Sequence, residues 1–275
     1  MTVIREVLSR VLFYLFSALI GAFFALPMLW LLLAPFNARG TLALEIPRPF
    51  TLANFEAVFA NTFAMRALLN SVFIAGGTML VVTLTATMAA YALSRAEVPY
   101  YDLLTYGLIL FSSVVTGTAA MVPIFLLANA LGLVDTYVGV ILTFTGGLLP
   151  TAIFILRDFV EGLPRSYEES AMVCGATPWQ MVRDVVMPLL QPGMMVVAIW
   201  AFVQVWGAFL IPFVLLRTPE RMPAAIAIYS FYTEAGTPIL TLTSAYALLY
   251  AIPVLVLYLF VNARYGFRFF GGIKR

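Results

Sequence analysis

Histidine is absent from this chain, cysteine occurs once, at Cys174, and charged residues make up only 10% of the sequence. A single cysteine forms no disulfide within the chain, and no cluster of cysteine and histidine is available to hold a metal ion. The phosphate-binding pattern G-x-x-x-x-G-K-[ST] is also missing, so the chain has no P-loop for ATP. We therefore expect no catalytic residue, no metal and no cofactor in this chain.

Charge is sparse in the predicted membrane-spanning segments as well. All 13 acidic residues fall in predicted loops or at the ends of predicted helices. Ion-coupled transporters commonly place ionisable side chains within the membrane, so this distribution disfavours an ion-coupled secondary transporter acting without an ATPase. That class stays open as the alternative, because carbonyl and hydroxyl oxygens also bind sodium. The net charge of +2 with scattered basic residues does not indicate a nucleic-acid partner.

What the sequence has in abundance is apolar residues, which make up 63% of the 275 positions. A helix that spans a membrane needs roughly 20 of them in a row. The sequence predicts an all-α membrane protein, one transmembrane domain over residues 1–275, with six spanning helices. Their expected ranges are 11–35, 68–93, 103–128, 137–157, 192–216 and 241–262. The first run is too long for a signal peptide, so we expect an uncleaved first helix.

The basic residues orient these six helices. With the N-terminus inside, ten basic residues fall in cytoplasmic segments and five in external ones, which matches the positive-inside rule. The cytoplasmic ten are Arg5, Arg10, Arg95, Arg157, Arg165, Arg183, Arg264, Arg268, Lys274 and Arg275. Both termini and the loop 163–190 are therefore predicted to be cytoplasmic.

One long polar stretch, residues 163–192, interrupts the apolar segments. Ser166 followed three residues later by Glu169 is a capping-box pattern, which predicts a short helix over about 167–174. Gly175 is suited to end that helix, because glycine readily adopts the left-handed conformation of a C-terminal cap.

A second short helix is predicted directly after this one. Thr177 and Pro178 are typical of the N-cap and first position of a helix. We expect this helix to reach Met187 and to be stopped by Pro188. The loop 163–190 is then a helix-turn-helix elbow.

The residues of this elbow resemble a known motif. The elbow contains Glu169-Ser170-Ala171, then Gly175 after three further residues, and Val-Val-Met-Pro at residues 185–188 after nine more. This pattern resembles the EAA loop, E-A-A-x3-G-x9-I-x-L-P, of permease subunits in binding-protein-dependent ABC importers. The departures from the motif are near-isosteric. In that family the loop is the cytoplasmic coupling helix that docks on the ATPase subunit. The resemblance implies an ATPase-coupling role for Ser166, Glu168, Glu169, Ser170, Ala171, Cys174, Gly175 and Pro188; an ordinary amphipathic cytoplasmic loop is the alternative.

The resemblance covers about residues 10–275 and is closest to the maltose-type, carbohydrate-uptake branch, as the stretch LLNSVFIAGGTMLVVTLTATMAAYALSR illustrates. It implies a type I ABC importer permease fold in a bacterial or archaeal plasma (inner) membrane, carrying a sugar or sugar derivative. The implied partners are two ATPase subunits that bind ATP and Mg, a second and unlike six-helix permease subunit, and an extracytoplasmic solute-binding protein. Which sugar is carried stays open.

Polar residues in the predicted spans are candidates for the solute path. Gln204 is an amide in an apolar segment and must face protein or solute, since an unpaired amide in hydrocarbon is costly. Trp206 lies close to it in the sequence, and Ser112 and Thr116 share a helix face at i, i+4. Hydrogen bonding between helices is the alternative role of these side chains. Gly207 stands where the family often has Asn, so no solute role transfers to that position.

Three local features complete the expectations. Asp135 is predicted to cap the fourth helix at its N-terminal end. Pro150 is predicted to interrupt that helix. The first external loop is predicted to end in a short helix near residues 55–59, in a segment that either contacts the solute-binding protein or serves as a solvated connector.

Overall fold

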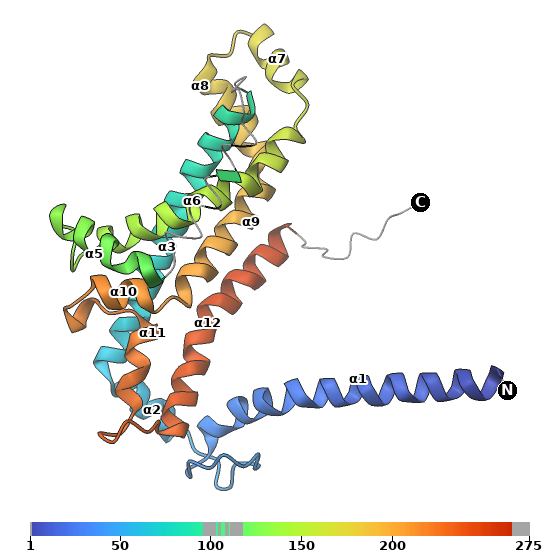
Figure 1. Cartoon of the computed structure of the whole chain (residues 1–275), viewed down its shortest axis with the longest axis vertical. Helices are drawn as coiled ribbons and strands as arrows, with labels where there is room; N and C mark the ends of the chain where they lie inside the picture. Colours follow the sequence, from blue (N-terminus) through green and yellow to red (C-terminus); the bar gives the residue numbers. More distant parts are fainter. Residues whose placement is uncertain (1, 96–102, 104–105, 108–109, 111–117, 266–275) are drawn as a thin grey trace. The chain divides into compact units, whose positions relative to one another are not determined.

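The computed structural model describes residues 2–95, 103, 106–107, 110 and 118–265, and these residues are helical with short connections (Figure 1). No strand occurs among them, and two isolated β-bridges join Asn37 to Phe50 and Tyr232 to Pro238. The elements are α1 (Thr2–Leu33), η1 (Ala34–Phe36), α2 (Ala53–Ala60), α3 (Thr62–Arg95), η2 (Thr118–Ala120), α5 (Met121–Ala130), α6 (Tyr137–Glu161), α7 (Ser166–Val173), α8 (Pro178–Met181), η3 (Val182–Val186), α9 (Met187–Trp206), α10 (Leu210–Leu215), η4 (Pro219–Arg221), α11 (Ala224–Ala227), η5 (Ile228–Phe231) and α12 (Leu240–Tyr265).

The chain divides into two compact units. One contains residues 1–65 and 227–252, and the other contains residues 66–226 and 253–275. Three helices, α3, α11 and α12, pass from one unit into the other.

Five helical segments of the described chain are long and apolar enough to cross a membrane. They are Ser9–Phe36, Thr62–Arg95, Tyr137–Glu161, Pro178–Trp206 and Leu240–Ala263. They correspond to the first, second, fourth, fifth and sixth predicted spans. Within the third prediction, 103–128, residues 104–105, 108–109 and 111–117 lie outside the described residues. Its described end belongs to the short apolar helix Thr118–Ala130.

Two of these spans differ from their predicted limits. Pro150 does not interrupt the fourth span, because α6 runs unbroken from Tyr137 to Glu161 with this proline inside it. The fifth span starts earlier than predicted and ends at Trp206 rather than at 216, because Gly207 caps α9 and a separate helix, α10, begins at Leu210.

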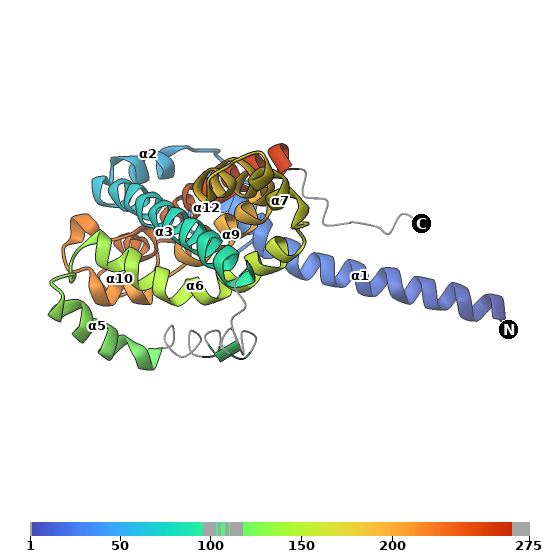
Figure 2. The same cartoon turned by 90° about the horizontal axis from the view of Figure 1, so that it is seen from above.

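In the larger unit, α6 packs along α9 (Figure 1) and also approaches α3 at Gly77. Figure 2 shows the same helices from above. Glycines make both approaches close. A Cβ atom on Gly77 of α3 would lie 2.8 Å from Ile141 of α6, and one on Gly193 of α9 would lie 2.5 Å from Phe159 of α6. Small residues at these two contacts let helix backbones approach closely, as is usual between helices in a membrane.

The smaller unit is organised around the turn after α1. The Asn54 side chain donates to the carbonyl oxygens of Pro35 and Asn37, at 2.8 and 2.9 Å. Phe36 stacks on Phe50 with ring centroids 4.9 Å apart. These contacts hold α2 in place, and its range, Ala53–Ala60, confirms the short helix predicted near residues 55–59.

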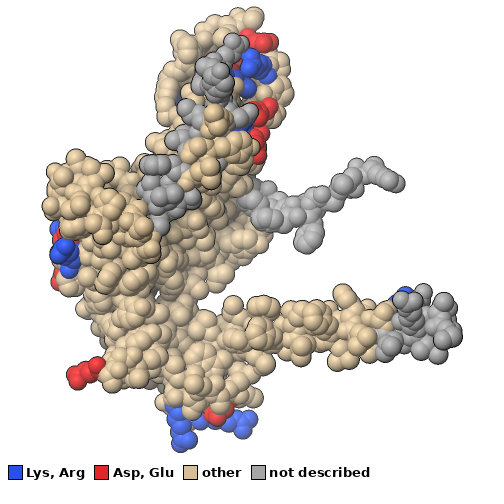
Figure 3. Space-filling view, in the orientation of Figure 1, with Lys and Arg blue, Asp and Glu red and all other residues tan. Residues whose placement is uncertain are grey.

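The helix α1 carries a long apolar surface. Large apolar side chains are exposed along this helix, including Phe13, Phe16, Phe23 and Met28 at 63% to 71%. On the face that Figure 3 shows, charged side chains gather at helix ends and connections, and the surface between them is uncharged. Such a surface is stable in lipid or against another apolar chain rather than in water.

Candidate functional site

The predicted elbow, residues 163–190, is formed by α7, α8 and η3 (Figure 1). Gly175 has φ +83, and the N–H groups of Gly175 and Ala176 donate to the carbonyls of Met172 and Ala171 at 2.9 and 3.0 Å. This is a Schellman motif, and it ends α7 where the sequence predicted. The left-handed conformation at Gly175 sets the turn of the elbow.

The start of α8 also follows the prediction. Thr177 is its N-cap, its hydroxyl accepts from the N–H of Gln180, and the Gln180 side chain accepts in return from the N–H of Thr177 at 2.9 Å. Pro178 occupies the first helical position, where its missing N–H is not needed. A capping box therefore fixes the second arm of the elbow.

The capping box predicted at Ser166 and Glu169 is wrong. Arg165 is the N-cap residue of α7 and already has helical angles, φ −58 and ψ −23, with no side-chain cap. Ser166 therefore lies inside the helix and accepts, through its carbonyl, a 2.7 Å bond from the hydroxyl of Ser170. Both side chains, like that of Glu169, are exposed.

The stop predicted at Pro188 is also wrong. The helix continues through this exposed proline as α9, and the preceding segment η3 is a π-helix whose wider turn lets the N–H of Met187 donate to the carbonyl of Val182. A π-helical turn shifts the hydrogen-bonding register, and this shift accommodates a residue that has no N–H. The elbow is therefore joined to the span α9 by continuous helical backbone.

Glu168 holds the first arm of the elbow against the end of α3. Its carboxylate accepts from the Arg95 Nε at 2.7 Å and from the Tyr91 hydroxyl at 2.9 Å. Arg95 also donates to the carbonyl of Leu163 at 3.2 Å. Of the charged residues that the structure describes, Glu168 is the only one that is buried, with 9% of its surface exposed. We call Tyr91, Arg95 and Glu168 the clamp.

Sequence reasoning placed Glu168 among the candidates but missed Tyr91 and Arg95. Tyr91 lies 77 residues and Arg95 73 residues before Glu168, at and just beyond the end of the predicted span 68–93. The one signal for Arg95 in the sequence was its place in the last turn of α3, because a positive charge there interacts favourably with the negative end of the helix dipole. Its pairing with Glu168 depends on tertiary structure.

The elbow also carries large apolar side chains that are exposed. Exposed fractions are 52% for Tyr167, 55% for Met172, 89% for Val173 and 64% for Trp179. Cys174 and Gly175 are exposed between them, and Ala171 is half-buried. Several large exposed apolar side chains on one short segment are typical of a protein interaction site.

The solute-path candidates do not form one cluster in the described residues. Gln204 of α9 is exposed, whereas Trp206 is 5% exposed and stacks on Phe202 with centroids 5.2 Å apart. Ser112 and Thr116 lie outside the described residues. Gln204 thus presents an amide on the outside of the chain, and Trp206 packs within it.

Asp135 does not cap α6 as predicted. Thr136 is the N-cap, and its hydroxyl accepts from the N–H of Gly139 at 3.0 Å. Asp135 has φ 60, and its carboxylate accepts from the N–H groups of Arg217 and Thr218, each at 3.0 Å, and pairs with Arg221 at 3.1 Å. The residue ties the α5–α6 turn to the segment after α10 instead.

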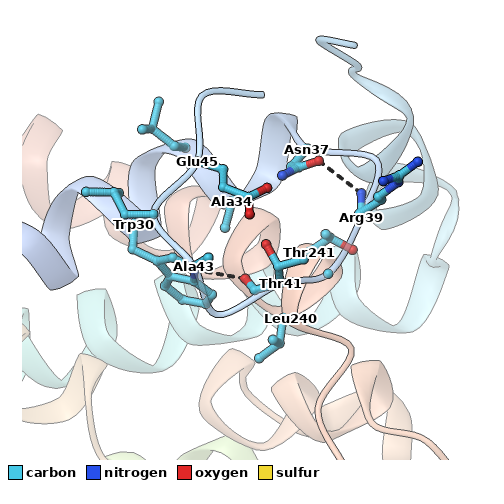
Figure 4. A pocket seen from close by; sticks show the side chains of 12 residues that line it. Trp30, Ala34, Asn37, Arg39, Thr41, Ala43, Glu45, Leu240 and Thr241 are labelled. Atoms are coloured by element: carbon cyan, nitrogen blue, oxygen red, sulfur yellow. Dashed lines mark hydrogen bonds between the residues drawn. The ribbon is translucent and has the colours of Figure 1, made fainter. Parts of the chain in front are cut away.

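Two cavities differ in what they can accept. The first, in the smaller unit, has a volume of about 10 Å³ and is lined by Trp30, Asn37, Thr41 and Thr241 among others (Figure 4). This is room for about one water molecule and not for a sugar. The second, about 260 Å³, lies between α5 and α6 and has an almost wholly apolar lining, which includes Leu127, Leu131 and Leu142. It offers few hydrogen bonds to a hydroxylated solute.

The described helices define an α-helical protein with several membrane spans. Its fold is similar to that of a chain in the crystal structure of a bacterial ABC transporter involved in the import of the acidic polysaccharide alginate. The TM-score is 0.77 at 21% identity, and the match covers 94% of this chain and 98% of the other.

Sequence comparison gives the family. The profile of the family described as binding-protein-dependent transport system inner membrane component matches residues 88–266, and the chain belongs to that family. It is 31% identical to the trehalose transport system permease protein SugB of Mycobacterium tuberculosis, over 90% of this chain and 91% of the relative. It is 27% identical to the maltodextrin transport system permease protein MdxG of Bacillus subtilis, over 94% of both chains. The chain is thus a multi-pass inner membrane permease of a binding-protein-dependent ABC importer, which confirms the resemblance drawn from the elbow.

Proposed function

We propose that this permease imports a sugar or sugar derivative by ATP-driven alternating access. The observation that carries the proposal is the chain's near full-length similarity to permeases named for trehalose and maltodextrin transport. Trehalose and short maltodextrins are therefore the first solutes to test.

Six spanning helices with both termini in the cytoplasm are part of this proposal. Five described spans support it, together with the short apolar helix Thr118–Ala130 at the end of the third predicted span. The distribution of basic residues, ten to five, supports the cytoplasmic placement of the elbow.

The elbow is the proposed docking site for an ATPase subunit. Its apolar surface, with Val173 and Trp179 exposed, supports this role, because a short helix whose apolar side chains face water needs a partner surface. Glu169, Ser170, Cys174 and Gly175 are exposed on the same elbow and are the proposed coupling residues with Ser166, Glu168, Ala171 and Pro188. Two such ATPases would bind ATP and Mg, and this subunit would be non-catalytic.

The proposed complex also contains a second, unlike six-helix permease subunit and an extracytoplasmic solute-binding protein. The exposed amide of Gln204 on the span α9 supports a partner within the membrane. Gln204 is the proposed solute-path residue of this chain, facing the space between the two permeases. Trp206 is buried against Phe202, so we propose that it supports the path from behind.

The test is reconstitution of the complete importer in liposomes with its binding protein. Uptake of radiolabelled trehalose or maltodextrin should require ATP on the elbow side and both ATPases. Uptake by this chain alone that stops when an uncoupler is added would contradict the proposal and favour an ion-coupled carrier. ATP-dependent uptake of another solute class, with neither sugar carried, would contradict the sugar assignment alone.

A further inference from the structure

The first arm of the elbow is connected to the membrane helices in three ways. On one side residues 162–165 join α7 to the end of α6, and on the other side α8 and the π-helical segment η3 lead into α9. The third connection is the clamp, which joins Glu168 of α7 to Tyr91 and Arg95 at the end of α3. The first two connections follow the chain, whereas the clamp links α7 to a span that is distant in sequence.

The chemistry of the clamp makes it a firm connection. Both oxygens of Glu168 are engaged, one by Arg95 and the other by Tyr91. The side chain of Glu168 is 11% exposed and that of Arg95 17%. An ion pair shielded from water in this way is weakened little by salt, and removal of one partner leaves a buried charge without compensation.

Two other ion pairs of the described residues connect neighbours in the sequence. Arg157 pairs with Glu161 one turn along α6, and Arg183 pairs with the adjacent Asp184. The clamp instead joins residues 73 positions apart, and Arg95 reaches further to the carbonyl of Leu163, where the chain enters the elbow. Arg95 therefore contacts both the start of the elbow and the centre of its first helix.

We infer that Tyr91 and Arg95 are positioning residues for transport, which hold α7 to α3 so that a movement imposed on the exposed side of α7 moves α3 with it. The inference rests on the proposed docking of an ATPase at the elbow. Glu168 is buried towards α3 while Tyr167 and Val173 of the same short helix are exposed, so α7 carries both the surface that meets the partner and the group that transmits its movement.

The first experiment separates ATP hydrolysis from uptake in the reconstituted importer. Arg95→Ala should lower the uptake per ATP hydrolysed by about tenfold, a typical size for coupling between sites. Tyr91→Phe, which removes one hydroxyl and leaves the ring, should lower it about threefold, and the charge exchange R95E/E168R should restore part of the loss. The control is Glu161→Gln, which breaks the local pair Arg157–Glu161 and should leave the ratio unchanged.

The second experiment observes the connection itself, independently of the solute. Cys174 is the only cysteine and is exposed, so one added cysteine at Met88, an exposed position of α3, gives a pair of spin-label sites. In the complete importer the distance distribution between the labels should stay narrow with and without ATP. Arg95→Ala should broaden it in both states.

The outcomes separate this inference from the proposed function. Suppose that the wild-type importer takes up solute with ATP, and that Arg95→Ala and Tyr91→Phe keep both a normal ratio of uptake to hydrolysis and a narrow distance distribution. This result would overturn the inference and leave the proposed function standing. Wild-type chain that transports without any ATPase would overturn the proposed function. A narrow distribution that shifts on ATP addition in the wild type would show that α7 moves independently of α3, and would also overturn the inference.

Discussion

Thr218 donates both its backbone N–H, at 3.0 Å, and its hydroxyl to the carboxylate of Asp135, although 83 residues separate the two. Asp135 in turn donates its own N–H to the carbonyl of Leu215 at 2.8 Å. The turn between α5 and α6 and the segment that follows α10 are therefore held together by one residue, at the opposite end of α6 from the elbow. Its left-handed backbone, φ 60, is uncommon for a residue other than glycine and is tolerated best by Asn and Asp.

The Asp135 cluster predicts a specific pH dependence. Bonds from the Thr218 hydroxyl, the Thr218 N–H and the Arg217 N–H lower the pKa of Asp135 from 3.8 to about 2. Because the folded-state pKa lies below the unfolded one, the stabilisation is complete above about pH 4 and is lost as the pH falls through about 2.

The measurement compares thermal unfolding of the wild type with that of Asp135→Asn in detergent between pH 6 and pH 2. Asn tolerates the same backbone conformation but carries no charge, so this variant should be about 1 kcal/mol less stable at pH 6, and the difference should shrink towards pH 2. A difference that does not change with pH would show that the carboxylate charge is not what holds the turn.

Gly175 should be intolerant of β-branched residues because of its backbone rather than its surroundings. A Cβ atom there meets nothing within 4 Å, but φ +83 is strained for any branched side chain. Gly175→Val should cost about 1 to 3 kcal/mol at the turn and should uncouple ATP hydrolysis from uptake, with membrane insertion intact. Gly175→Asn is the matched control and should retain most coupling, since Asn enters the left-handed region more readily. Normal solute-stimulated ATPase activity and uptake in the Val variant would contradict the proposed role of the turn.

Gly193 should be required for the contact between α9 and α6. An added methyl group would lie 2.5 Å from Cγ and 3.0 Å from Cβ of Phe159, so the whole phenyl side chain must move. Gly193→Ala should therefore lower stability by about 1 to 3 kcal/mol through overpacking. Gly146→Ala on α6, where a Cβ atom meets nothing within 4 Å, is the control and should be neutral or slightly stabilising in the same thermal assay. Equal melting temperatures for the two variants would argue against a close α6–α9 contact.

Gln204 is expected to act on solute uptake rather than on folding, because its side chain is exposed on α9. Gln204→Leu removes one hydrogen-bonding group, worth about 1 kcal/mol, and should weaken uptake about fivefold with unchanged melting temperature. Initial rates across solute concentrations in the reconstituted importer provide the measurement. Unchanged kinetics would return Gln204 to a structural role between helices.

The features that sequence reasoning predicted correctly are local ones. The Schellman motif at Gly175 and the cap at Thr177 depend on residues within one helical turn, so their chemistry is visible in the sequence itself. The apolar spans are likewise a property of composition along the chain. The family resemblance rested on these same residues and is confirmed by the match over residues 88–266.

The features that it missed depend on contacts between distant segments. Asp135 precedes a helix and looks like its cap, but the neighbouring Thr136 takes that role and Asp135 binds a segment more than 80 residues away. Ser166 has the spacing of a capping box, yet the helix begins one residue earlier, at Arg165 as N-cap. Glu168 rather than the adjacent Glu169 is buried because it pairs with Arg95. No local pattern around Glu168 contains that information.

Cys174, the only cysteine of the chain, is exposed at the end of α7 and reports on which side of the membrane the elbow lies. The measurement is labelling by a membrane-impermeant maleimide in intact cells and in inverted membrane vesicles, each prepared with and without the ATPase subunits. We expect no labelling in intact cells, and labelling in inverted vesicles that is weaker when the ATPase subunits are present. Labelling of Cys174 in intact cells would place the elbow outside the cell and would show that it cannot meet a cytoplasmic ATPase.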